Sequence, residues 1–120
     1  MPELCDLTAT SLRQLIGLKE VSPVELLESC INRTKNTNNI LNALVTLDYK
    51  NAKKEAKIAE KQILKGANVG PLHGLPIGIK DLEETKNLKT TFGSLLYKDY
   101  VPRVDQQSVA SIRAAGGIIL

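Results

Sequence analysis

A lysine at the end of an apolar segment is the residue of this sequence best suited to chemistry. Residues 70–81 read GPLHGLPIGIKD, which predicts a strand from residue 75 that carries Lys80 near its end. Successive side chains of a strand point to opposite faces. One face therefore holds the bulky side chains and an aspartate: Leu75, Ile77, Ile79 and Asp81. The other face has only Pro76 and Gly78 beside Lys80, which leaves open space next to the amine.

Two interpretations of Lys80 follow from the strand alone. The first is an edge strand whose lysine points to water and discourages aggregation. The second is a general base, which must be neutral at the working pH, and burial favours the neutral amine because desolvation disfavours ammonium. Strand alternation turns Asp81 to the other face, where it would not oppose that shift. In this chain alone we expect the Lys80 amine to be hydrated.

Composition sets outer limits on the class of protein. With 120 residues and 42% apolar content, the chain is at most one small globular domain. A net charge of +3 does not indicate a nucleic-acid or membrane partner, and the lysines of residues 50–65 alternate with Glu55 and Glu60 as on a solvated helix face. The few aromatic residues give no stacking platform for bases: Tyr49, Phe92, Tyr97 and Tyr100.

The cysteines and the apolar runs bear on compartment and cofactors. Cys5 and Cys30 have neither metal-ligand nor redox-motif spacing, so reduced thiols in the cytoplasm are the expected state. No apolar run approaches the length needed to cross a membrane. We expect no metal and no organic cofactor.

The first half of the sequence predicts three helices and a strand. A helix over residues 10–18 has Thr10 as its N-cap, and a second starts at Ser22-Pro23-Val24-Glu25, a capping box with proline at the first position. Cys30 falls on the apolar face of that helix as a small core residue. A polar turn at 36–39, a strand at 41–47 and a helix at 49–64 follow. Asp48 caps this last helix, Gly66 ends it, and its apolar face is small: Ala52, Ala56, Ala59 and Ile63.

The second half predicts a parallel pair of strands. Residues 82–100 have no clear period and hold the polar stretch 90–94, which is typical of a loop. Asp105 is the expected cap of a helix with Val109 and Ile112, and residues 118–120 form a buried strand. Strand, helix and strand at this spacing predict a right-handed crossover in an α/β fold with a mixed sheet between helices, of which two or three strands are visible. Because the sequence stops inside an apolar strand, we expect a piece of a larger domain; the alternative is a complete small α/β protein.

A family resemblance adds to these expectations. The segment GPLHGLPIGIKDLEETKNLKTTFGSLLYKDYVP, followed by a capped helix and RAAGGIIL, resembles the amidase signature family. That family has its N-terminal helices and first strand at the positions of three earlier segments: DLTATSLRQLI, VSPVELLESCINRT and LNALVTLD. The resemblance implies that residues 1–120 are the N-terminal portion of a single amidase domain with an α/β/α sandwich fold, truncated before its serine-containing segment.

The resemblance also implies a mechanism. Members of the family hydrolyse amide C–N bonds with a nucleophilic serine, a second serine on a cis peptide bond and a lysine base. Lys80 matches the lysine, and both serines lie beyond residue 120, so this chain alone is expected to be inactive. The sequence that follows Lys80 is closer to that of general amidases than to that of the A subunits of tRNA-dependent amidotransferases. A third alternative is a non-catalytic module that binds a partner through its exposed sheet edge.

Other side chains are weaker candidates for a functional role. His73, the only histidine, lies in a turn and is expected to be structural or exposed rather than catalytic. Thr90, Thr91 and Ser94 are candidates to hydrogen-bond around the lysine or the substrate channel, or to tie down their own loop. Asp81 is a candidate to hold backbone donors near the site, or to start the following turn. The expected partners are a small-molecule amide and the remainder of the amidase domain, with no nucleic acid and no membrane; a homodimer is an open alternative.

Overall fold

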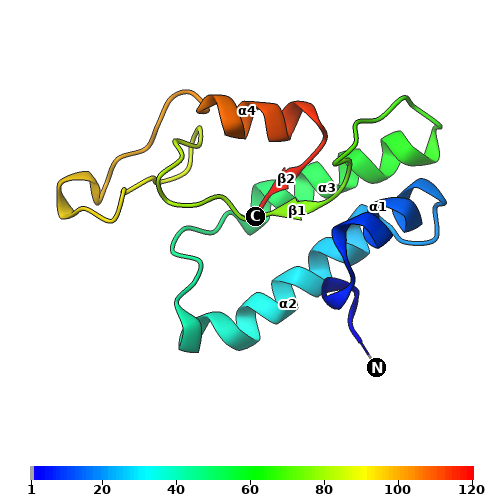
Figure 1. Ribbon diagram of the computed structural model, residues 1–120, viewed down its shortest axis with the longest axis horizontal. Coiled ribbons are helices and arrows are strands. Elements are labelled where there is room, and N and C mark those ends of the chain that lie inside the picture. The colour runs from blue at the N-terminus through cyan, green and yellow to red at the C-terminus, as the bar shows by residue number, and fades with distance from the viewer. Residues whose placement is uncertain (1) are drawn as a thin grey trace.

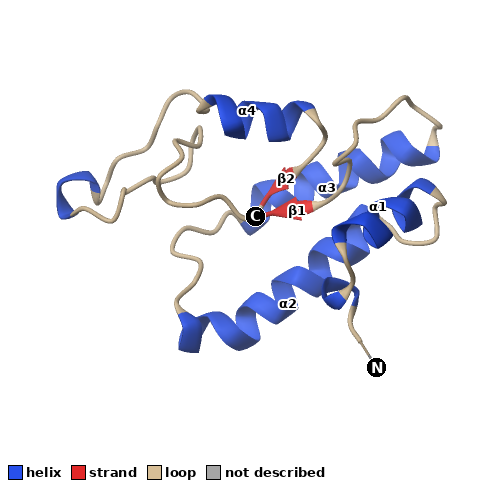
Figure 2. Ribbon diagram, in the orientation of Figure 1, coloured by secondary structure: helices blue, strands red, loops and turns tan. Residues whose placement is uncertain are grey.

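The computed structural model describes residues 2–120, which form mainly helices around a small parallel sheet (Figures 1 and 2). In chain order the elements are η1 (Leu4–Asp6), α1 (Ala9–Gly17), α2 (Pro23–Leu41), α3 (Tyr49–Leu64), β1 (Pro76–Ile77), η2 (Leu95–Tyr97), α4 (Gln107–Ala114) and β2 (Ile118–Ile119). The two strands lie at the centre, with α4 above and α2 below them in the view of Figure 1. The segment between β1 and α4, yellow to orange, projects away from the helices.

The predicted parallel pair is confirmed, and the predicted mixed sheet is not seen in residues 2–120. Pro76 pairs with Ile118 and Ile77 with Ile119, and α4 forms the connection. The ladder bonds run from Ile118 N to Leu75 O (2.9 Å) and from Leu120 N to Ile77 O (3.1 Å). β1 is shorter than the expected strand, since its ladder with β2 covers only Pro76 and Ile77.

Local capping chemistry positions the two long helices as predicted. Ser22 Oγ accepts from Val24 N (3.0 Å) while Glu25 accepts from Ser22 N (2.9 Å), which completes the capping box of α2. Asp48 Oδ1 accepts from Asn51 N (3.2 Å) at the start of α3. Gly66 follows the end of α3 with a φ of 72°, a conformation that favours glycine.

The predicted turn at 36–39 and strand at 41–47 are both wrong. α2 continues to Leu41 and ends at Asn42, which is left-handed with a φ of 50°. The Asn38 side chain donates to Leu44 O (2.8 Å) and accepts from Leu44 N (2.9 Å). Because this amide satisfies the backbone groups of Leu44, residues 42–47 do not need a strand partner and follow an irregular path.

Two expected caps are also wrong. α1 starts one residue early, and its cap is Thr8, whose hydroxyl accepts from Ser11 N (3.1 Å), rather than Thr10. α4 has Gln106 at its N-cap with no side-chain bond. Asp105 instead accepts from Lys86 N (2.7 Å) and pairs with Arg113 (2.9 Å), so tertiary partners outcompete the local cap.

The core consists of two apolar clusters. One joins α2, α3 and β2 through Leu27, Ile31, Ala52, Ala56, Ala59 and Ile118. The other joins α1, α2, the end of α3 and the residue before β1 through Leu12, Ile16, Leu26, Ile63 and Leu75, with Cys30 packed against it. The predicted small face of α3 is therefore confirmed, and it lets α3 lie close to α2. None of the helices in residues 2–120 is long and apolar enough to span a membrane.

Overpacking this small face gives a direct stability test. Ala56 is fully buried, so we expect Ala56→Leu to lower the free energy of unfolding by about 1–3 kcal/mol, because the added methylenes push α2 and α3 apart. Urea unfolding followed by circular dichroism measures this change. Ala67→Leu, at an exposed position after α3, is the matched control and is expected to change stability by less than about 0.5 kcal/mol.

Candidate functional site

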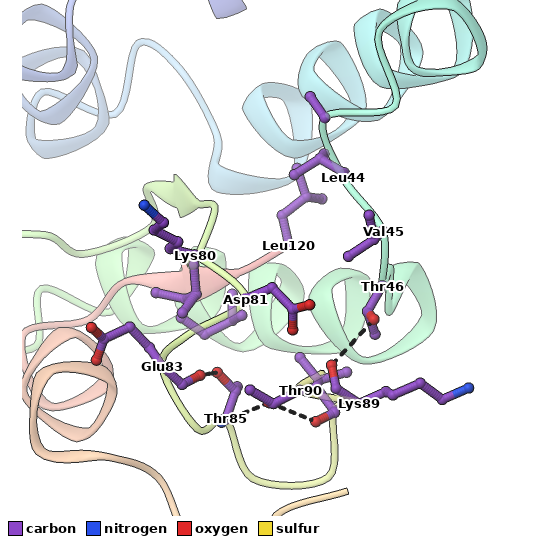
Figure 3. Close-up of a pocket in the computed structure, with 14 residues that line it drawn as sticks. Leu44, Val45, Thr46, Lys80, Asp81, Glu83, Thr85, Lys89, Thr90 and Leu120 are labelled. Atoms are coloured by element: carbon purple, nitrogen blue, oxygen red, sulfur yellow. Dashed lines mark hydrogen bonds between the residues drawn. The ribbon is translucent and has the colours of Figure 1, made fainter. Parts of the chain in front are cut away.

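A pocket of about 170 Å³ lies where the carboxyl ends of β1 and β2 meet (Figure 3). Parallel strands present such crevices at their carboxyl ends, where α/β proteins place their sites. Three segments line the pocket: residues 43–46 after α2, residues 79–90 after β1, and residues 119–120 at the end of β2. From the second segment the lining residues are Ile79, Lys80, Asp81, Glu83, Thr85, Leu88, Lys89 and Thr90.

Lys80 lines this pocket and is exposed, with its amine directed away from Asp81, Thr85 and Thr90 (Figure 3). Its side chain and that of Asp81 point in different directions, as strand alternation predicts (Figure 3). In the described residues 2–120 Lys80 takes part in no ion pair. The amine is therefore accessible to water, in agreement with the expected hydrated lysine.

Asp81 ties the two ends of the following loop together. Its Oδ1 accepts from Thr91 N (2.7 Å), its Oδ2 accepts from the Thr91 hydroxyl, and its carbonyl accepts from Phe92 N (3.0 Å). These three bonds close the loop 82–90, which supplies part of the pocket lining. Of its two predicted roles, Asp81 thus holds backbone donors.

The predicted polar residues divide into one that lines the pocket and two that do not. Thr90 is buried in the lining, where its hydroxyl donates to Leu88 O (3.2 Å) and accepts from Thr85 N (3.4 Å). Thr91 is bound to Asp81 outside the lining. Ser94 caps η2 by accepting from Leu96 N (3.3 Å). The structure brings Lys80, Asp81 and Thr90 together and leaves Thr91 and Ser94 in the loop's own framework.

Residues 43–46 are the part of the lining that the sequence did not indicate. They were expected to form a strand, and the Thr46 hydroxyl instead donates to Lys89 O (3.2 Å), which joins this segment to the loop after β1. Leu120 was detectable, because it ends a parallel strand beside the one that precedes Lys80.

His73 has the predicted structural environment. It is buried, and its Nε2 lies 2.9 Å from Ala59 O, which is an acceptor, so this nitrogen donates. The bond attaches the turn at 71–74 to α3, away from the pocket.

The two thiols are free and partly buried. Burial, with a smaller contribution from the neighbouring Cys5, raises the pKa of the Cys30 thiol, which disfavours the reactive thiolate. Within residues 2–120 no group of three or more histidine, cysteine or acidic side chains is arranged to hold a metal ion.

Comparison with known proteins assigns the family. The family model described as Amidase matches residues 25–120. The chain therefore belongs to the Amidase family, the amidase signature enzymes.

Curated relatives include two A subunits of glutamyl-tRNA(Gln) amidotransferase. That of Geobacter sp. (strain M21) is 34% identical over 98% of this chain, and that of Geotalea daltonii is 35% identical over 98%. The chain spans about a quarter (24%) of the length of both relatives.

Solved structures of amidases share the fold. A bacterial aryl acylamidase of the amidase signature family is 27% identical with a TM-score of 0.87, and the chain covers 24% of it with 95% of its own residues. A fatty acid amide hydrolase is 26% identical with a TM-score of 0.91; 99% of this chain covers 22% of it. The peptide amidase of Stenotrophomonas maltophilia is 26% identical with a TM-score of 0.88, with 96% and 24% covered. The chain is thus a fragment of the amidase signature fold.

Proposed function

We propose that this segment belongs to an amidohydrolase that cleaves a linear carboxamide C–N bond, with Lys80 as the base of a serine, cis-serine and lysine relay. The observation that carries the proposal is the presence of Lys80 in the lining of a pocket at the carboxyl ends of two parallel strands. The two serines are supplied by sequence outside these 120 residues. The mechanism needs no metal and no organic cofactor.

The pocket supports the proposal as one part of a larger site. Its volume of about 170 Å³ is below the roughly 300–1,000 Å³ of ordinary small-molecule sites. Large apolar side chains in the projecting segment are solvated, with Leu95 and Leu96 at 87% and 91% exposure. Contact with the remainder of an amidase domain would cover such surface and desolvate Lys80, which favours the neutral amine that a base requires.

Hydrolysis of simple amides tests the proposal. A protein that continues this sequence through its serine-rich segment is expected to release ammonia from at least one of a panel of aliphatic, aryl and peptide carboxamides. The 120-residue chain, assayed in parallel at the same concentration, is expected to show no turnover. Steady hydrolysis by the rigorously purified short chain would contradict the proposed division of the site.

A second candidate is the A subunit of a tRNA-dependent glutamine amidotransferase, which shares this chemistry. The curated relatives at 34–35% identity carry that name, which favours it. The sequence after Lys80, DLEETKNLKTTFGS, favours a general amidase. Glutamine hydrolysis that requires partner proteins and rises with glutamyl-tRNA would support the amidotransferase; hydrolysis of other carboxamides by the protein alone would support the amidase.

A further inference from the structure

The outer face of α3 carries a regular row of exposed lysines. This lysine row consists of Lys50, Lys54, Lys57, Lys61 and Lys65. At 3.6 residues per turn the five positions fall within an arc of about 80°. The buried side chains of α3 occupy the opposite side of the helix: Ala52, Ala56, Ala59 and Ile63. The row is therefore a single cationic strip.

The acidic residues of α3 do not neutralise this strip. Glu55 pairs with Arg113 (3.4 Å), and Glu60 accepts from the Ser22 hydroxyl (2.5 Å). No member of the lysine row has an ion-pair partner within residues 2–120. Like charges three or four residues apart destabilise a helix by about 0.2–0.5 kcal/mol per pair, so the row costs stability that no contact in the described chain offsets.

One end of the row opens into a hollow of about 630 Å³. Lys50 and Lys54 line it together with Lys86, which comes from the loop after β1. Arg113 also lines the hollow, but its guanidinium is neutralised by Asp105 (2.9 Å) and Glu55 (3.4 Å). The acidic lining residues are Asp48, which caps α3, and Glu55 and Asp105, which pair with Arg113. Lysines from two segments thus line one hollow and leave it with a small excess of positive charge.

We propose that the lysine row and Lys86 bind the phosphate backbone of a nucleic acid, contrary to the expectation from the net charge of +3 and from the alternation of these lysines with Glu55 and Glu60. From Lys50 to Lys65 the row extends about 22 Å at 1.5 Å per residue. A duplex strand winds around its axis once in about 34 Å and does not follow a straight row, so the number of contacts is bounded by the six ammonium groups of the row and Lys86. A helix that lies in a membrane surface needs a continuous apolar face to insert. The large exposed apolar residues of α3 are two, Ile58 and Leu64, so a membrane is the less favoured partner. Without aromatic side chains on this strip, binding is independent of sequence.

The salt dependence of binding tests this proposal on the 120-residue chain itself. Fluorescence anisotropy with labelled 20-base-pair RNA and DNA duplexes, between 50 and 200 mM salt, is expected to give a log–log slope near −5, about −0.9 per phosphate contact. The triple variant Lys54→Ala/Lys57→Ala/Lys61→Ala is expected to flatten the slope by about 3 and weaken binding at least about tenfold at 50 mM salt. Alanine is a better helix former than lysine, so α3 is retained, and circular dichroism checks this.

A matched variant separates a local surface from net charge. Lys35→Ala/Lys98→Ala/Arg103→Ala removes the same three charges at exposed positions off the row and is expected to leave the slope within about one of the original. Binding to either duplex with this contrast supports the proposal. Equal loss in both variants, no binding at 50 mM salt, or stronger binding to polyglutamate or to phosphatidylglycerol vesicles would overturn it. None of these results bears on amide hydrolysis, which is assayed separately.

Discussion

Lys80→Ala is expected to lower kcat/KM for amide hydrolysis by about 10²- to 10⁴-fold in the longer protein that contains this segment, the range typical of a lost general base. The reason is that Lys80 is the pocket-lining lysine whose amine has no ion-pair partner within residues 2–120. The other lining lysine, Lys89, is turned toward Asp99 (3.9 Å). Steady-state kinetics on the best substrate of the panel measure the effect.

Two further variants show whether the loss concerns proton transfer. Lys80→Arg keeps the positive charge, but a guanidinium stays protonated and cannot act as a base, so its activity should be as low as that of Lys80→Ala. Lys35→Ala, on the exposed side of α2 and remote from the pocket, should retain full activity. An arginine variant with near-normal kcat would show that the site needs only a cation at position 80, and would refute the base.

Local chemistry explains which elements were predictable. α2 and α3 begin where Ser22 and Asp48 can cap them, and both signals lie within three residues of the donors they satisfy. The parallel pairing of β1 and β2 follows from two apolar segments joined by a helix of suitable length. Such features need no knowledge of the rest of the fold.

Two of the errors arose where a polar side chain bonded to a residue outside its own helix turn; the wrong cap of α1 was a local error, because Thr8 rather than Thr10 accepts from Ser11 N. Asp105 was expected to cap α4, but Arg113 and the backbone of Lys86 attract its carboxylate instead. Asn38 satisfies the backbone of Leu44, six residues away, and so removes the reason for a strand at 41–47. These partners become adjacent only once the chain has folded.

The candidate site shows the same division. Lys80 was found because alternation along the expected strand sets it apart from Asp81, although β1 itself ends at Ile77. The wall formed by residues 43–46 was missed, because its position depends on where α2 ends and on the bond from Thr46 to Lys89. The bond between Asp81 and Thr91, ten residues further along, was likewise not predictable, because it depends on the path of the loop between them.

Asp81→Ala is expected to open the loop that lines the pocket. The substitution removes both hydrogen bonds from Thr91 to the carboxylate. A hydrogen bond to a charged group contributes about 1.5–3 kcal/mol to stability, and the lower value applies here because both bonds are partly exposed. Losing about 1.5–3 kcal/mol of local stability should speed hydrogen exchange of the Thr91 amide roughly tenfold to a hundredfold. Exchange followed by NMR on the 120-residue chain measures this directly.

The control for the loop is Asp99→Ala, which removes an exposed carboxylate whose ion pair with Lys89 spans 3.9 Å. Exposed pairs contribute little, so exchange at Thr91 should stay within about threefold of the original rate. Because α2, α3 and their core clusters do not involve Asp81, amides there should keep their protection in both variants. Unchanged exchange at Thr91 in Asp81→Ala would mean that the Phe92–Asp81 backbone bond alone holds the loop closed, and that the carboxylate is free for another role beside Lys80.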